Sequence, residues 1–156
     1  MDKIIGIGDY VISNNPDDIV KTFALASCVA VTVYNPFLQL AGMIHIALPN
    51  PMHQDDARCR PAYYATSGIP LLIRKVCGDY GSRREDLQVK LFGGADSLRT
   101  DDYFKIGPKN IKAVQETLLS LGLKIEDAYI GGLISRSITM SVSTGEIEIV
   151  ALSIKF

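Results

Sequence analysis

Two apolar runs joined by an Asn-Pro turn constrain the fold of this chain more than any other feature. The runs cover residues 25–34 and 40–49, and Tyr34-Asn35-Pro36-Phe37 lies at the junction. Each run has the length and character of a strand, and Asn-Pro interrupts both helix and strand. The pattern therefore predicts an antiparallel β-hairpin with a four-residue loop, Asn35 to Leu38.

That loop length places a cysteine opposite a histidine. Tyr34 pairs with Gln39 in this register, so Cys28 pairs with His45. Directly opposed residues share one face of a sheet, with Cβ atoms about 4.5–5.5 Å apart. A thiol beside an imidazole is the pair that nucleophilic cysteine catalysis requires. The alternative is that Cys28 is a small buried hydrophobe and His45 an ordinary hydrogen-bonded strand histidine.

The same register divides the hairpin into two faces. The face that carries Cys28 and His45 has small or polar neighbours, and we expect a substrate to approach it. A slip of one residue would send the thiol and the imidazole to opposite faces. The other face is apolar and is predicted to meet the core; it comprises Val29, Val31, Val33, Leu40, Gly42 and Ile44.

The rest of the pattern predicts a layered α+β fold. Helices are expected over 67–77, with Pro70 in the first turn, and over 107–121. The segment 49–61 is expected to be a polar loop near a site. Because strands and helices do not alternate strictly, we expect a layered mixed or antiparallel β core flanked by two or three helices. Further strands are predicted at 3–13, 19–23, 87–92, 123–130, 138–142 and 147–156.

Composition excludes several classes of protein. The 156 residues suit one domain, 1–156, and a net charge of −1 favours neither nucleic acid nor an anionic membrane as a partner. No stretch approaches the ~20 apolar residues of a membrane span, so no membrane insertion is expected. Nothing resembles a signal peptide, and three cysteines without a framework spacing indicate reduced thiols in the cytoplasm.

No metal or cofactor is expected. His53, Cys59 and Cys77 lack the paired spacing of a zinc site, and Gly6-Ile7-Gly8 lacks the third glycine of a dinucleotide loop. Two further glycine pairs, Gly93-Gly94 and Gly131-Gly132, each follow a predicted strand. They indicate either turns with positive φ or a close approach of backbone to a substrate.

Seven short segments in order resemble the CheD family of chemoreceptor glutamine deamidases. The T-x-G-L-G-S-C-V and H-x-x-L-P blocks of that family are similar to residues 22–29 and 45–49. The resemblance covers nearly the whole chain, and its other segments are Ile4 to Tyr10, Tyr63-Tyr64-Ala65, Phe92 to Ala95, Ile106 to Asn110 and Gly131-Gly132.

The resemblance implies hydrolysis of glutamine side-chain amides on methyl-accepting chemotaxis receptors, giving glutamate and ammonia. It assigns a catalytic triad to Cys28, His45 and Thr22, and Ser27 would lie at the oxyanion site. It also implies a CheC-type phosphatase as a partner and a fold like that of the cytotoxic necrotizing factor deamidases. If His45 forms an ion pair with Cys28, the thiol pKa should lie well below about 8.5.

Two departures from the family pattern leave an alternative open. Ala24 and Ala26 stand where the family has glycine, and alanine resists positive φ. The alternative is therefore a catalytically weakened regulator that binds a CheC-type phosphatase or a receptor helix. A cysteine protease or transglutaminase-like enzyme is the third hypothesis. Thr22 can reach the site only if the chain bends before Ala26, because six extended residues span about 20 Å.

Overall fold

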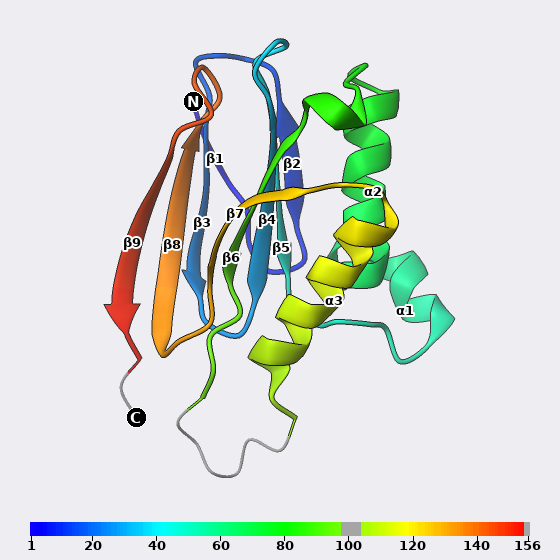
Figure 1. Cartoon of the computed structure of the whole chain (residues 1–156), viewed down its shortest axis with the longest axis vertical. Helices are drawn as coiled ribbons and strands as arrows, with labels where there is room; N and C mark the ends of the chain where they lie inside the picture. Colours follow the sequence, from blue (N-terminus) through cyan, green and yellow to red (C-terminus); the bar gives the residue numbers. More distant parts are fainter. Residues whose placement is uncertain (98–103, 155–156) are drawn as a thin grey trace.

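Two stacked β-sheets and one layer of helices make up the protein (Figure 1). The computed structural model describes residues 1–97 and 104–154. The four-stranded sheet has the order β1-β3-β8-β9 and the five-stranded sheet the order β2-β5-β4-β6-β7. Each sheet is mixed, because β1 pairs parallel with β3 and β6 pairs parallel with β7. The layered α+β expectation is confirmed.

The elements follow one another with short connections. The four-stranded sheet comprises β1 (Asp2–Ile4), β3 (Ile19–Leu25), β8 (Ile134–Ser141) and β9 (Ile147–Ser153). The five-stranded sheet comprises β2 (Tyr10–Ser13), β4 (Val29–Asn35), β5 (Leu40–Ile46), β6 (Gln88–Gly93) and β7 (Ile125–Ile130). The helices are α1 (Gln54–Cys59), α2 (Ala65–Gly78) and α3 (Ile106–Ser120), with the 3-10 turns η1 (Pro61–Tyr63) and η2 (Arg84–Asp86).

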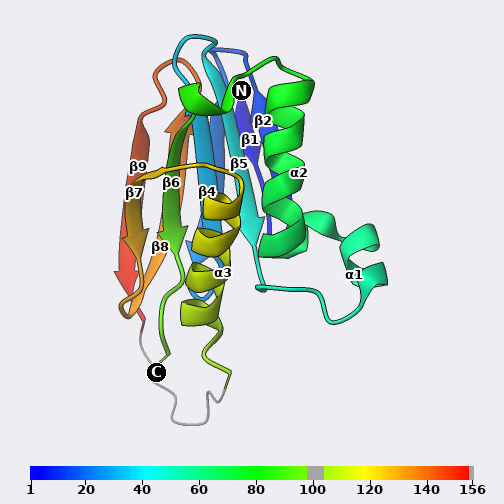
Figure 2. The same ribbon diagram turned by 45° about the vertical axis from the view of Figure 1, so that its right-hand side comes forward.

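The predicted hairpin lies at the centre of the molecule and is buried on both faces. Every residue of β4 and β5 is buried. One face packs under the helices, which lie side by side with α2 over β5 and α3 over β4 (Figure 2). Leu72, Ile73 and Leu118 meet the valines of β4 there. The other face packs against the four-stranded sheet, where Met43 and Phe92 meet residues of β8.

The hairpin register differs from the predicted one by two residues. Ala30 pairs with His45, and Asn35 pairs with Leu40. The loop therefore covers residues 36–39, because the Asn35 side-chain oxygen accepts the N–H groups of Phe37 and Leu38 and keeps Asn35 in the strand. A shift of two preserves the side-chain alternation, so the two predicted faces are confirmed. The prediction that Cys28 lies directly opposite His45 is wrong.

Other expectations need correction. The face that carries His45 is covered by the second sheet and does not lie open to a substrate, since Ala30, Met43 and His45 are almost fully buried. The predicted strand at 3–13 is two strands, separated by a turn at 5–9. The polar loop at 49–61 contains α1. The α2 helix begins two residues earlier than predicted, which places Pro70 inside the helix rather than in its first turn. The predicted last strand extends to residues 155–156, which lie outside the described residues.

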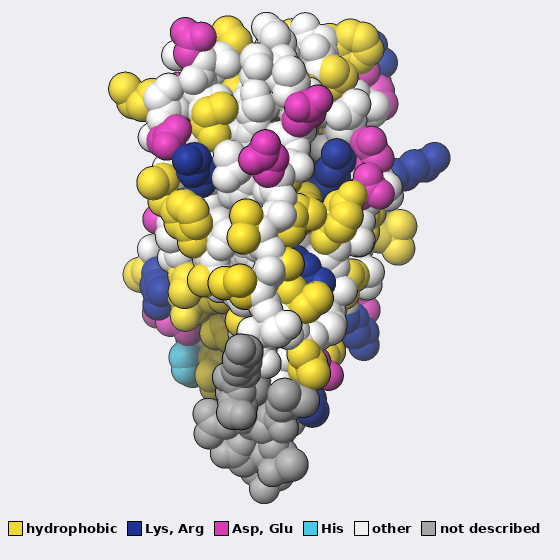
Figure 3. All heavy atoms as spheres, turned by 90° about the vertical axis from the view of Figure 1, so that its left-hand side faces the viewer, with side chains coloured by type: hydrophobic (Ala, Val, Ile, Leu, Met, Phe, Trp, Pro, Cys, Tyr) yellow, Lys and Arg dark blue, Asp and Glu magenta, His cyan; other side chains and the backbone are white. Residues whose placement is uncertain are grey.

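Among the described residues, no helix covers the outer face of the four-stranded sheet. Figure 3 views the molecule from this side and shows apolar side chains across the middle of the face. Phe23, Val150 and Leu152 contribute to them and are 51%, 63% and 68% exposed. Within the described part of the chain, no helix combines the length and the apolar character needed to cross a membrane.

Candidate active site

Thr22 and His45 are in contact between the two sheets, near the end where β3 finishes and β4 begins, and Cys28 packs against the same inter-sheet cluster. Continuing the β4–β5 register by one pair sets Cys28 opposite Ala47, so Cys28 is the diagonal neighbour of His45 on the same face. Cys28 is half-buried and packs against the cluster between the sheets. Thr22 is fully buried and belongs to β3 of the other sheet.

A bend after Thr22 resolves the distance problem that an extended strand would pose. The pairing of β3 with β8 shifts between Thr22 and Leu25, and Ala24 there has a φ of 55°. The backbone N–H of Ala24 donates a hydrogen bond to the Ser137 hydroxyl at 2.9 Å. The predicted bend is therefore confirmed, and Ala24 occupies the left-handed region that glycine prefers. Ala26 is not among the residues with positive φ.

Hydrogen bonds of Thr22 determine which nitrogen of His45 carries the proton. Thr22 Oγ1 lies 3.0 Å from the Ile5 carbonyl oxygen and 2.7 Å from His45 Nδ1. A hydroxyl has one hydrogen, which it donates to the carbonyl, so it accepts the other bond from Nδ1–H. Nε2 is then the unprotonated nitrogen. It is buried and has no hydrogen-bond partner among the described residues.

Burial sets the charge state of the pair. It raises the pKa of the Cys28 thiol and lowers the pKa of His45 to about 4, against a smaller opposite effect from the Asp9 carboxylate. The resting site is thus a neutral thiol beside a neutral imidazole. The lowered thiol pKa expected for an ion pair is contradicted, because the sheet that covers the pair removes the water that would solvate both charges.

The segment Gly6 to Asp9 is hydrogen-bonded to the backbone of His45. The backbone N–H of His45 donates to the Asp9 carbonyl at 3.0 Å, and the backbone carbonyl of His45 accepts the Gly8 N–H at 2.8 Å. Gly8 has a φ of 79°, and a Cβ there would lie 2.9 Å from the Tyr63 ring. Glycine at this position therefore permits close packing over the histidine.

The backbone that leads into β4 is held at three consecutive carbonyls. Ala26 O accepts the Ala95 N–H at 2.7 Å, Ser27 O accepts the side chain of Asn110 at 2.9 Å, and Cys28 O accepts the Gly94 N–H at 2.8 Å. Within residues 1–97 and 104–154, the N–H groups of Ser27 and Cys28 donate no hydrogen bond.

Two pairs of glycine residues lie near the segment from Ala26 to Cys28. Gly93 and Gly94 have φ values of 105° and 66°, and a Cβ on Gly93 would overlap the Cys28 carbonyl oxygen. Gly131 and Gly132 also have positive φ. The turn interpretation is therefore confirmed at both pairs. At Gly93 the close approach is to the backbone of Cys28 itself.

A hollow of about 640 Å³ opens beside Ser27 and Ala26. Its lining comes from the bend after Thr22, from the start of α3 and from the end of β9, including Ala24, Gly107 and Leu152. The hollow thus reaches Ser27, the residue before Cys28, whereas Cys28, His45 and Thr22 do not line it.

The remaining cysteines lie apart from this site. Cys59 is exposed at the end of α1, and Cys77 is half-buried near the end of α2. Within the described residues, no three His, Cys, Asp or Glu side chains are grouped as a metal site would need.

Comparison with known proteins matches this chain to a family model described as CheD chemotactic sensory transduction, over residues 47–151. The chain belongs to the CheD family. It is 40% identical over 150 residues to a probable chemoreceptor glutamine deamidase CheD of Syntrophotalea carbinolica, covering 95% of this chain and 93% of the relative. It is 33% identical over 147 residues to the chemoreceptor glutamine deamidase CheD of Thermotoga maritima, covering 94% and 90%.

Solved structures show a similar fold at much lower identity. The hypothetical protein YfiH of Bacillus licheniformis has a TM-score of 0.50 at 12% identity, and YlmD of Geobacillus stearothermophilus has a TM-score of 0.51 at 14%. Each match covers 80% of this chain but 49% of the other. The chain thus spans about half of those proteins, and the likeness concerns the fold alone.

One residue at this CheD site was not predicted as functional. Asn110 was noted only as the end of the family-like segment Ile106 to Asn110. It is fully buried and bonded to two carbonyls beside the nucleophile. The signal in the sequence was a polar residue on the apolar stripe of a helix, next to Gly107-Pro108.

Proposed function

We propose that this protein hydrolyses the side-chain amide of glutamine residues on chemoreceptors, giving glutamate and ammonia. The observation that carries the proposal is the 2.7 Å contact between Thr22 Oγ1 and His45 Nδ1, because it leaves Nε2 as a base on the face that Cys28 shares. Membership of the CheD family supports the substrate, since its curated relatives carry the name chemoreceptor glutamine deamidase.

The reaction would begin with proton transfer from Cys28 to His45. As the sulfur attacks the carboxamide carbon, Nε2 takes the thiol proton, so a permanent thiolate is not required. The N–H groups of Ser27 and Cys28, which donate to no other described residue, would stabilise the oxyanion that forms. The His45 imidazolium then returns its proton to the nitrogen, and ammonia leaves a thioester on Cys28. Water, activated by the neutral imidazole, hydrolyses the thioester to glutamate and restores the thiol.

Thr22 would orient the imidazole without touching the substrate. Its hydroxyl fixes the tautomer that places the lone pair on Nε2, and its own donor is committed to Ile5 O. Substitution should cost less activity at Thr22 than at His45, because water can replace a hydroxyl but not the base. The retained Thr22–His45 contact also favours an enzyme over the weakened regulator.

The substrates would be met in the cytoplasm, where the receptors' helical domains lie. A CheC-type phosphatase, which the family resemblance implies as a partner, remains a prediction.

The test is incubation of the protein with a receptor cytoplasmic fragment, followed by peptide mass spectrometry for conversion of glutamine to glutamate. We expect conversion by the parent and none by Cys28→Ala, because alanine cannot form the thioester. Cys59→Ala is the matched control, since Cys59 is exposed and outside the site. Conversion by a folded Cys28→Ala protein would disprove the assignment, and loss of activity in Cys59→Ala would point to another thiol.

A further inference from the structure

Asn110 is a fully buried polar residue in the first half of α3. Its side-chain nitrogen Nδ2 donates to Ser27 O at 2.9 Å and to Ala47 O at 3.0 Å. Ser27 precedes the proposed nucleophile, and Ala47 follows His45 by two residues. One carboxamide from a helix therefore joins the strand end that carries Cys28 to the strand end that carries His45.

The Asn110 side chain links β4 and β5 beyond the point where their backbone pairing ends. The last pair of the β4–β5 ladder is Val29 with Ile46. Beyond it, the Ala47 N–H turns away to the Tyr63 carbonyl at 2.9 Å. On the other strand, Cys28 O accepts the Gly94 N–H, so among the described residues no backbone hydrogen bond joins the two strand ends directly at Cys28 and Ala47. The two N–H bonds of the Asn110 amide close this gap.

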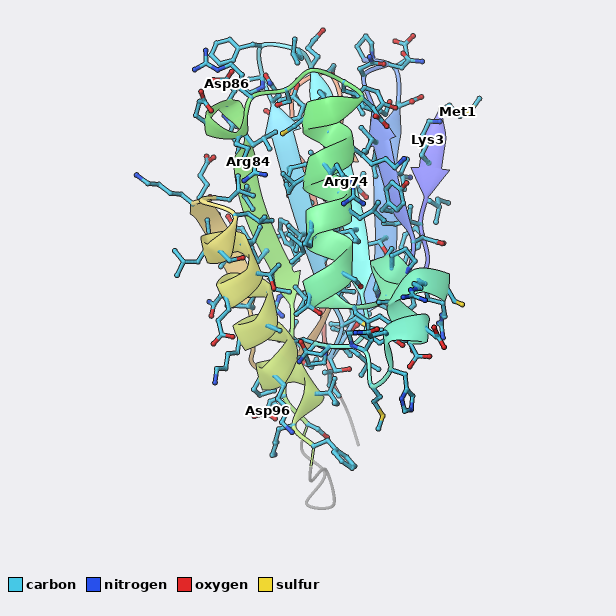
Figure 4. The ribbon with its side chains drawn as sticks, turned by 90° about the vertical axis from the view of Figure 1, so that its right-hand side faces the viewer. Met1, Lys3, Arg74, Arg84, Asp86 and Asp96 are labelled. Atoms are coloured by element: carbon cyan, nitrogen blue, oxygen red, sulfur yellow. The ribbon has the colours of Figure 1, made fainter. Side chains whose placement is uncertain are left out.

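Glycine lets the helix come close enough to make the bridge. Gly107 lies three residues before Asn110, on the same face of α3. A Cβ at Gly107 would overlap the Ala95 carbonyl oxygen, and a Cβ at Gly94 would overlap Ile111. Figure 4 shows Asp96, the next residue along that strand exit, beside the first turn of α3. Its carboxylate lies 3.6 Å from the Lys105 ammonium, which adds an ion pair at the same contact.

The second observation concerns the other end of the Asn110 side chain. Its Oδ1 is buried and has no hydrogen-bond partner among the described residues, and His45 Nε2 is the other such atom there. Both belong to this site. Selection for stability alone removes unpaired buried polar atoms, so those that persist concentrate where a protein performs its function.

We propose that Asn110 is a positioning residue, which holds the backbone of Cys28 in register with His45 for attack on the substrate amide. The inference rests on the proposed function, and it adds a residue on α3 to a site built from strands. It assigns no contact with the substrate to Asn110. Its effect runs through the carbonyls of Ser27 and Ala47, which it fixes.

The test compares Asn110→Asp and Asn110→Ala with Thr117→Val. A carboxylate has nearly the shape of the carboxamide but donates nothing to the two carbonyls, and alanine removes the group. Thr117 is a matched control on the same helix, because it is nearly buried and its hydroxyl donates to Ala113 O within α3. We expect kcat on a receptor fragment to fall about 10- to 100-fold in both Asn110 variants. KM should stay within about twofold, because substrate binding is not removed.

A second measurement does not depend on the reaction. Released strand ends should expose the thiol, so iodoacetamide should alkylate Cys28 at least about threefold faster in the Asn110 variants, with the rate at Cys59 unchanged. If the parent converts no glutamine, the proposed function fails and the alkylation rates alone decide the inference. Unchanged kcat in both Asn110 variants overturns the inference. An equal kcat loss in Thr117→Val, unchanged alkylation, or failure of both Asn110 variants to fold also overturns it.

Discussion

At the scale of single residues, the site depends on a histidine that burial keeps neutral. His45 is 2% exposed, and its Nδ1 proton is committed to Thr22. A neutral imidazole can accept a proton from the thiol, whereas an imidazolium cannot. The low histidine pKa thus supports function near neutral pH, and it makes stability sensitive to acid.

We predict that His45 makes the protein less stable between pH 6.5 and 4. The pKa of His45 is lowered from 6.5 to about 4 in the folded protein, so the unfolded chain binds more protons in this window. Stability associated with neutral His45 is therefore full above pH 6.5 and is lost as pH falls towards 4. At about pH 4.5 the loss should be on the order of 2–3 kcal/mol.

Urea unfolding at neutral pH and at about pH 4.5 measures this loss, with His45→Asn as the reference because asparagine does not titrate. The parent should lose more unfolding free energy than the variant. Equal losses in the two proteins would show that His45 is not buried in the neutral form.

At the scale of elements, the bend in β3 brings Thr22 to the site. The alanine in this bend, Ala24, is held in an unfavourable backbone conformation. Ala24 has a φ of 55°, and its exposed side chain has little packing to lose. Left-handed backbone costs an L-residue with a Cβ roughly 1–2 kcal/mol. The family's preference for glycine at this position has a direct steric reason.

Ala24→Gly should therefore raise stability by about 0.5–1 kcal/mol, since the relief of strain exceeds the roughly 0.4–1 kcal/mol that glycine costs through the unfolded chain. Ala26→Gly is the control and should lower stability, because Ala26 has no positive φ to relieve. Deamidation should stay within a few-fold in both, since the bend already has the glycine-like shape. Thermal unfolding and the receptor assay check the pair. A large gain of activity in Ala24→Gly from an inactive parent would support the regulator alternative.

At the scale of the whole molecule, two packed layers share the central hairpin. Met43 is fully buried between the sheets, whereas Leu152 on the uncovered outer face is 68% exposed. Truncating a buried methionine leaves a cavity that the surrounding sheets cannot fill.

We expect Met43→Ala to lower the free energy of unfolding by about 2–5 kcal/mol, and Leu152→Ser to change it by less than about 0.5 kcal/mol. Urea unfolding of both variants measures the difference. A large loss in Leu152→Ser would show that the outer face is covered in solution, for instance by a second copy of the chain.

The sequence by itself determined the elements and the faces of the hairpin. Alternating valines in β4, the Asn35-Pro36 break and the proline-to-glycine span of α3 are local signals, and each led to an element that the structure contains. Family-like blocks around Cys28 and His45 identified the family. The site role that the family resemblance gives to Thr22 also required a bend after it, because an extended strand could not reach the site.

Only the tertiary structure decided how these parts meet. The two-residue register shift arises because Asn35 caps its own turn, and alternation alone cannot distinguish registers that differ by two. The contact of Thr22 with His45 joins two sheets. The neutral charge of Cys28 and His45 follows from the sheet that covers them. Asn110 lies 83 and 63 positions along the chain from Ser27 and Ala47, the two residues that it bridges. These features depend on packing between distant segments, which a local pattern does not encode.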